Sequence, residues 1–363
     1  MDIEVIIWRG FNNMNTKLIE FIETSFLKDL LLKDTITDIS YNGESLYYQD
    51  NLSGRNKSDL KVTNEEVYAF LRQIANLTDS QFSYSEPILD VSVGKYRISG
   101  LHSSLARKNR EKVFNFSIRI GFDSLRIEDD GSFINKRALS LLDEALLNKC
   151  SIVIAGKTGA GKTEFQKFLV SRMNENTRLI LIDNINEFET NFFKDNLDSQ
   201  TWLVKKDKNN FDDLIKNALR NNPDWIIVGE ARGEEMQACL NSTMSGSPTI
   251  TTMHSRDAQS VYHRIARMCM INSKNLVFDE TLQDVNEHFR FIVYVKRVYD
   301  EKKKCYVRYV DSISTNDKGK YLELYKYPNT FKKLPTDIRT MFDMNLIEFN
   351  KFNRRFAGIK NEI

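Results

Sequence analysis

Residues 151–170, SIVIAGKTGAGKTEFQKFLV, set the architecture of this chain. A short run of β-forming residues meets a loop with three glycines, and an amphipathic segment follows that loop. Gly156, Gly161, Lys162 and Thr163 fit the pattern G-x-x-x-x-G-K-[ST] of a phosphate-binding loop. Glycines let the backbone turn tightly and direct its N–H groups at phosphate oxygens, and the following helix adds the positive end of its dipole. The stretch predicts a nucleotide site between a strand and a helix.

The loop predicts ATP and Mg²⁺ as ligands. Lys162 is expected to reach the β- and γ-phosphates, and the Thr163 hydroxyl is expected to hold Mg²⁺. The whole loop is expected to line the nucleotide, and its residues are Gly156, Lys157, Thr158, Gly159, Ala160, Gly161, Lys162 and Thr163. Kinases, switches and motors all carry such a loop, so it does not by itself fix the function.

A second informative stretch is ALRNNPDWIIVGEARGEE, residues 218–235. Trp225–Val228 reads as a buried strand, and Glu230 follows at its carboxyl end, the edge at which parallel sheets bind ligands. A glutamate there can orient and deprotonate the water that attacks a γ-phosphate. Glu230 is therefore a predicted candidate for the catalytic base.

Two further stretches supply candidate residues. Asp183 closes the strand RLILID and Glu187 follows four residues later; either is suited to hold Mg²⁺ or to orient the attacking water. His254 follows the apolar strand TITTM and is suited to touch the γ-phosphate, although a lone histidine is as often structural. The sequence leaves the choice between Glu187 and Glu230 as base open.

From about residue 136 the chain alternates helix and strand. The expected strands are Ser151–Ala155, Leu179–Asp183, Trp225–Val228 and Thr249–Met253. This alternation predicts a parallel sheet with helices on both faces. After about Glu287 the pattern returns to strands, in FIVYVKRVYD, KKCYVRYVDSIS and KYLELYKY.

The first third of the chain reads as a smaller α+β unit. Two helices are expected, at 14–32 and at 64–77 with Thr63 as its cap. The expected strands are 38–41, 45–48, 88–93, 96–101 and 113–119, with a hairpin turn at Asn42-Gly43. The acidic stretch IEDDGSFINK lacks periodicity and reads as a linker. The expected domains are thus 1–126, a linker at 127–136, and 137–363.

Composition narrows the class of protein. The chain has 363 residues, 41% of them hydrophobic and 28% charged, which is typical of a globular protein. A net charge of +2 gives no reason to expect nucleic acid as a direct partner. The four cysteines are far apart, so neither a zinc module nor a disulfide framework is expected. No signal peptide and no membrane-length apolar run is visible, so a cytoplasmic location is expected.

The motifs together resemble those of the secretion traffic ATPases, the motors of type II and type IV secretion and of type IV and Tad pili. GKTGAGKT, LIDNINEF, LRNNPDWIIVGEARGEE and TITTMHS occur in that family's order. LLKDTITDISYNG, FSYSEPILDVSVGKYRISGL and FSIRI resemble the N-terminal half of the Tad-pilus and type IV secretion branch. The chain departs from the family pattern at Ile182, where a glutamate is usual, and at Gly246-Ser247, where a Gly-His pair is usual.

The resemblance implies a RecA-like P-loop motor domain preceded by a smaller α+β domain that closes over the nucleotide. It implies a ring of six subunits at the cytoplasmic face of a membrane, held there by inner-membrane platform proteins. Arg97 and Arg119 match the arginines that act on the phosphates best, with Arg107 and Arg110 as weaker matches. Arg232 is expected to link the active site to the subunit contact.

Several functions remain open at this point. The leading one is ATP hydrolysis that drives secretion, pilus assembly or conjugation. The alternatives are a DNA-translocating motor, which would want a basic pore loop, and a regulatory nucleotide binder with weak turnover. An ABC-type subunit is disfavoured because NLSG, residues 51–54, precedes the phosphate loop, and a small-molecule kinase would not explain Gly229-Glu230. The cargo and the direction of work, extension or retraction, cannot be read from the sequence.

Overall fold

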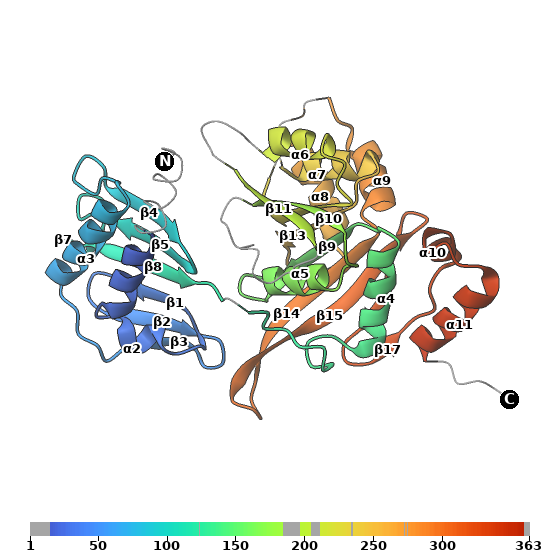
Figure 1. Ribbon diagram of the computed structural model, residues 1–363. Helices are drawn as coiled ribbons and strands as arrows, with labels where there is room; N and C mark the ends of the chain where they lie inside the picture. The colour runs from blue at the N-terminus through green and yellow to red at the C-terminus, as the bar shows by residue number, and fades with distance from the viewer. Residues whose placement is uncertain are drawn as a thin grey trace. The chain divides into compact units, whose positions relative to one another are not determined.

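The computed structural model of the protein describes residues 15–122, 124–183, 197–204, 211–233, 235–271, 273 and 275–358 (Figure 1). The chain divides into two compact units. The first comprises Met1–Asp123 and Tyr299–Val307, and the second comprises Ser124–Val298 and Arg308–Ile363. Each unit has a sheet of its own and is described separately.

The first unit is built on a six-stranded sheet in the order β3-β2-β1-β8-β5-β4. All of its strand pairs are antiparallel. Burial alternates along the strands, so one face packs on helix α3 (Asn64–Leu77) and the other is open. The strands are β1 (Ile36–Tyr41), β2 (Leu46–Asp50), β3 (Gly54–Lys57), β4 (Ile88–Val93), β5 (Tyr96–Leu101) and β8 (Asn115–Ile120), beside a small ribbon of β6 (Arg107–Lys108) and β7 (Glu111–Lys112).

Local sequence signals explain most of these elements. Thr63 and Glu66 form a reciprocal capping box at the start of α3, which confirms the predicted helix and its cap. The Asn42 side chain accepts hydrogen bonds from the backbone N–H groups of Glu44 and Ser45, which fixes the predicted hairpin turn. Strands β4 and β5 have the predicted bounds.

The single helix predicted over 14–32 is wrong. The described part is helical from 15 to 24, turns at 25–27, and resumes as α2 (Lys28–Leu31). The Ser25 hydroxyl donates to the Ile22 carbonyl at 2.7 Å and accepts from the Leu27 N–H at 3.2 Å. These side-chain bonds compete with the helical ladder and explain the break.

The second unit contains a nine-stranded sheet in the order β11-β10-β12-β13-β9-β14-β15-β16-β17. The pairs from β11 through β14 are parallel, whereas β15, β16 and β17 pair antiparallel. The strands are β9 (Ile152–Gly156), β10 (Arg178–Asp183), β11 (Asp198–Leu203), β12 (Trp225–Glu230), β13 (Thr249–His254), β14 (Phe291–Asp300), β15 (Cys305–Asp317), β16 (Lys320–Lys326) and β17 (Thr330–Phe331). The protein is therefore a mixed α/β structure with a parallel-rich sheet.

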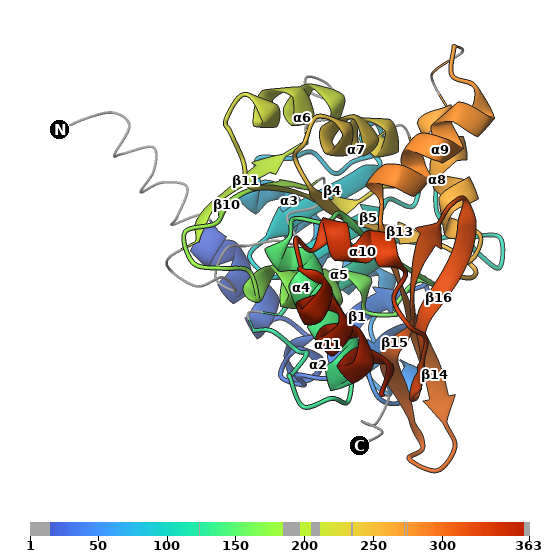
Figure 2. The ribbon, with the colours of Figure 1, turned by 90° about the vertical axis from the view of Figure 1, so that its right-hand side faces the viewer.

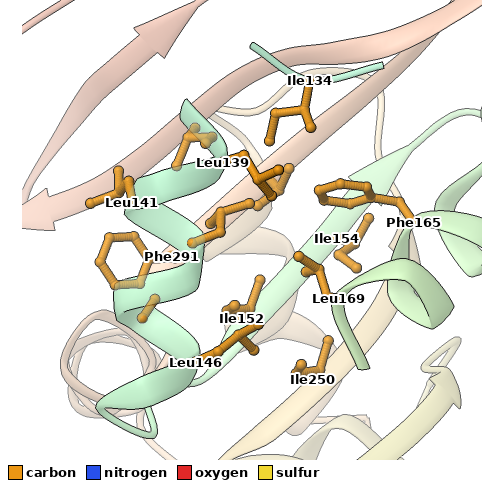
Figure 3. Close-up of a cluster of buried hydrophobic side chains, with 14 of the residues drawn as sticks. Ile134, Leu139, Leu141, Leu146, Ile152, Ile154, Phe165, Leu169, Ile250 and Phe291 are labelled. Carbon is orange, nitrogen blue, oxygen red and sulfur yellow. The ribbon is translucent and has the colours of Figure 1, made fainter. Parts of the chain in front are cut away.

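Helices cover both faces of this sheet, as predicted. The helices are α4 (Lys136–Leu147), α5 (Lys162–Ser171), α6 (Phe211–Leu219), α7 (Glu235–Met244), α8 (Val261–Cys269), α9 (Phe278–His288), α10 (Thr336–Met341) and α11 (Leu346–Ala357). Ile152 and Ile154 of β9 point into a core formed with α4, α5, α10 and α11 (Figures 2 and 3). Val153 and Ala155 point into a second core formed with α6 to α9. A strand buried on both faces needs this continuous apolar run.

The segment 127–136 is part of the second unit. Ile127, Phe133 and Ile134 are buried in the same core as α4, and the Phe133 carbonyl accepts from the Val310 N–H at 2.7 Å.

In the part of the chain that the structure describes, no helix is long and apolar enough to cross a membrane.

Candidate functional site

The candidate site lies at the carboxyl ends of four neighbouring strands, β10, β12, β13 and β9. These ends carry Asp183, Glu230, His254 and Gly156. His254 pairs directly with Gly156 across β13 and β9. The parallel topology thus brings together four positions that are widely separated in the sequence.

The phosphate loop connects β9 to α5, which begins at Lys162. Gly159 and Gly161 have φ values of +72° and +96°, the left-handed region that glycine tolerates best. A Cβ at Gly156 would lie 2.5 Å from the Val295 carbonyl oxygen, so the close approach of β9 and β14 requires glycine there. Lys157, Thr158 and Gly159 form the exposed rim of the loop, and Lys162 is 7% exposed.

Four side chains form a continuous line of contacts at this edge. Lys162 Nζ lies 3.3 Å from His254 Nδ1, and His254 Nε2 lies 2.8 Å from Glu230 Oε1. Arg232 Nη2 donates to Glu230 Oε2 at 2.8 Å. The structure therefore brings three of the predicted catalytic residues together, with Arg232 at the outer end of the line.

The line fixes the protonation state of His254. Burial lowers the pKa of His254 below its ordinary value and the charge of Lys162 lowers it further, so the ring is neutral at pH 7. An ammonium group can only donate, so Nδ1 accepts from Lys162 and the ring proton resides on Nε2, facing Glu230. Burial raises the pKa of Glu230, but Arg232, His254 and Lys162 outweigh burial and hold that pKa below its usual value. Glu230 is thus an ionised carboxylate at neutral pH.

A β-bulge aims Glu230 at His254. The register of β12 against β13 shifts between Val228 and Glu230, so Gly229 is the extra residue. Its carbonyl accepts from the Thr252 hydroxyl at 2.8 Å. A Cβ at Gly229 would lie 2.7 Å from Asp183 Oδ1, so glycine also makes room for that carboxylate.

A fully buried glutamine ties the bulge to the helix of the phosphate loop. Gln166 of α5 donates from Nε2 to the Val228 carbonyl at 2.9 Å and to the Ile250 carbonyl at 3.0 Å. Gln166 has no solvent exposure. These two bonds tie α5 to β12 and β13, the strands that end at Glu230 and His254.

The expected Mg²⁺ ligands are placed in part. Asp183 is 2% exposed and Thr163 lies in the first turn of α5. Glu187 lies outside the described residues. Among the residues that the structure describes, no three histidine, cysteine, aspartate or glutamate side chains are grouped to hold a metal. Mg²⁺ usually keeps several waters and takes one or two protein ligands plus substrate phosphates, so Thr163 and Asp183 fit it.

Arg97 and Arg119 belong to the first unit. They are directly opposite each other on β5 and β8, and Arg119 is exposed on the open face of that sheet. On its other side Arg119 faces Asp38 of β1. The structure thus places the two arginines as neighbours, and their action on nucleotide remains a prediction.

Sequence reasoning missed two arginines beside the phosphate loop. Arg297 lies on β14 and Arg308 on β15, and Arg308 Nε donates to the Gly159 carbonyl at 3.0 Å. Both strands were expected, but only the position of β14 next to β9 shows that they pass the loop.

Comparison with known proteins gives consistent matches. Residues 118–290 match the model of the family described as type II/IV secretion system protein. An uncharacterized protein, pXO2-25 of Bacillus anthracis, is 29% identical over 275 residues, covering 74% of this chain and 61% of that protein. The type IV secretion system protein VirB11 of Bartonella quintana is 29% identical over 143 residues, covering 37% of this chain and 38% of VirB11. The chain thus spans less than two thirds of both relatives.

Among solved structures, the ATPase DotB of Yersinia pseudotuberculosis aligns with a TM-score of 0.62. The alignment covers 92% of this chain and 85% of DotB at 16% sequence identity. At that identity the likeness speaks for the fold alone.

Proposed function

We propose that this chain, which carries a type II/IV secretion system protein domain at residues 118–290, hydrolyses ATP to drive a secretion, pilus-assembly or conjugation machine. The observation that carries the proposal is the contact line from Lys162 through His254 to Glu230, at the carboxyl edge of a parallel sheet. It joins the residue suited to bind phosphate with the residue suited to activate water. The chain resembles the family of secretion ATPases.

The residues divide the reaction as follows. The loop N–H groups and Lys162 bind the phosphates and neutralise charge that develops on the γ-phosphoryl group. Water attacks the γ-phosphorus, the bond from phosphorus to the β–γ bridging oxygen breaks, and ADP and phosphate form. Glu230 orients that water and accepts its proton. His254 lies between the two groups, with Nε2 2.8 Å from Glu230 Oε1 and Nδ1 3.3 Å from Lys162 Nζ, so it couples them.

Mg²⁺ would supply a further positive charge at the phosphates when bound. Thr163 and Asp183 are the residues that would hold it, directly or through water. Glu187 remains a proposed third ligand or alternative base. The pKa of Glu230 is held below its usual value, so the carboxylate is ionised at neutral pH, as a group that accepts a proton must be.

The finer features of the proposal rest on the family resemblance. Residues 137–363 are proposed as a RecA-like P-loop motor domain, and residues 1–126 as a smaller domain that closes over nucleotide through Arg97 and Arg119. The working form is proposed as a hexameric ring in the cytoplasm, peripheral to the membrane through inner-membrane platform proteins, with Arg232 near the subunit contact. The match to VirB11 supports the type IV secretion branch, and the Tad-pilus branch remains a further proposal.

The test is Glu230→Gln, which keeps the size of the side chain but removes its basicity. We expect ATP binding to persist while phosphate release falls by about 10²–10⁴-fold, the contribution of general base catalysis. Glu280→Gln on α9 is the matched control, because it makes the same change outside the site. Normal hydrolysis by Glu230→Gln would move the base elsewhere, with Glu187 as the next candidate.

A further inference from the structure

The β14–β15 hairpin carries two arginines at facing positions. The rings of Tyr299 and Tyr306 meet across the hairpin with their centroids 5.2 Å apart. Arg297 lies two residues before Tyr299 on β14, and Arg308 lies two residues after Tyr306 on β15. Side chains two residues apart in a strand share a face, so Arg297 and Arg308 lie side by side on the face of that ring pair.

Both arginines reach the phosphate loop of their own unit. Arg308 Nε donates to the Gly159 carbonyl at 3.0 Å. A Cβ at Gly159 would lie 3.4 Å from Arg297 Nη1, and one at Gly161 would lie 3.5 Å from Arg308 Cδ. The hairpin therefore borders the exposed rim of the loop, on the side of β9 away from β13.

The arrangement concentrates positive charge. Burial, together with the charges of Arg297 and Arg126, lowers the pKa of Arg308 to about 10. Arg308 is still a cation at pH 7, and its guanidinium lies beside the loop together with that of Arg297.

We propose that Arg297 and Arg308 bind the phosphate chain of the nucleotide from the hairpin side of the loop. The proposal rests on the proposed ATP site and adds a second, basic wall to it. A guanidinium presents five N–H donors in a planar fork that matches phosphate oxygens, and the Arg308 guanidinium already reaches the loop through its bond to Gly159. In this arrangement the second unit supplies arginines of its own to the nucleotide.

The experiment tests three variants, Arg308→Gln, Arg297→Gln and the double variant of these two changes. Lys303→Gln is the control. Lys303 lies at the turn of the same hairpin, so its variant removes the same charge away from the loop. Binding of a fluorescent, non-hydrolysable ATP analogue is titrated at several salt concentrations, and far-UV circular dichroism checks folding. We expect each arginine variant to bind about tenfold more weakly, the loss of one charge-assisted hydrogen bond. We also expect a shallower salt dependence, because fewer charges contact the phosphates.

Each other outcome has a definite meaning. Weaker binding with an unchanged salt dependence would show that Arg308 only braces the loop through Gly159, and would overturn the phosphate contact. Binding equal to that of Lys303→Gln would overturn the inference while leaving ATP binding in place. A wild-type protein that binds no ATP analogue would refute the proposed function and this inference together. Arg308→Lys separates the contribution of the charge to binding of the analogue from that of the planar fork, because lysine keeps the charge but cannot form the fork.

Discussion

The two sheets of this protein present polar side chains in different ways. In the parallel sheet, inner strands such as β9 are buried along their whole length, and β12 and β13 become accessible only at Glu230 and His254, where they end. In the antiparallel sheet, strands such as β8 expose every second residue, and Arg119 lies in the middle of such a row. A functional residue of the parallel sheet is thus marked by its place after an apolar run, whereas one on the open face has no such mark.

The same contrast appears in the two arginine pairs. Arg97 and Arg119 are opposite each other on the open face of the first unit. Arg297 and Arg308 are side by side on β14 and β15, in the parts of those strands that belong to the second unit, where Arg308 contacts the phosphate loop. The first pair was assigned to nucleotide from family resemblance and the second from contacts in the structure, so each can be tested against the other.

The largest effect is expected for Lys162→Ala, which tests the site at the carboxyl ends of the parallel strands. The change removes the buried ammonium that contacts His254 and is expected to reach the phosphates. We expect phosphate release to fall by at least ~10²-fold, because charge stabilisation is the main catalytic contribution in phosphoryl transfer. Lys216→Ala, which removes an exposed lysine from α6, is the control. Unchanged phosphate release in Lys162→Ala would exclude the ATPase assignment.

The open face is tested by the double variant Arg97→Ala with Arg119→Ala. We expect activity to fall by about tenfold with the fold retained, as when a charged group loses its contact with a phosphate. Arg55→Ala with Arg72→Ala removes two exposed arginines from the same unit and serves as the matched control. If the Arg97/Arg119 double variant is as active as the Arg55/Arg72 control, nucleotide chemistry belongs to the second unit alone. Arg297 and Arg308 then become the sole arginine contacts proposed for the nucleotide.

Much of the fold could be predicted because its signals are local. Strand β12 begins with the apolar run WIIV, β13 is a buried run rich in β-branched residues, and β4 and β5 alternate around a turn, so both kinds were found. Strand β11, DSQTWL, was missed because it lies at the sheet edge with few buried residues and no apolar run. Helices α10 and α11 were missed as well, although Asn345 and Glu348 form a capping box at the start of α11.

The site was predicted less completely than the fold, for a physical reason. Lys162, Glu230 and His254 follow from motifs at strand ends, and the structure joins them. The bulge at Gly229 depends on how β12 pairs with β13. The approach of Arg308 to the loop depends on the order of strands in the sheet. Register and strand order are properties of the folded chain that no single segment encodes.

The smallest expected effect concerns the titration of His254. Its pKa is lowered in the folded protein, first by burial and then by Lys162, so the unfolded chain takes up a proton at higher pH than the folded one. Stability from this group is therefore fully present above the unfolded pKa of about 6.5 and is lost as the pH falls below it. Between pH 7.5 and pH 5.5 we expect the melting temperature of the wild type to fall slightly more than that of His254→Gln, by no more than about 2 °C.

Glutamine is the suitable replacement because it donates and accepts hydrogen bonds but does not titrate in this range. Lys162→Met should reduce the difference, because it removes the charge that opposes protonation of His254. Equal pH dependence in the wild type and His254→Gln would show that the histidine is not held neutral by its neighbours. It would then be an ordinary polar residue at the end of β13, and the link between Lys162 and Glu230 would have to run through the bound nucleotide instead.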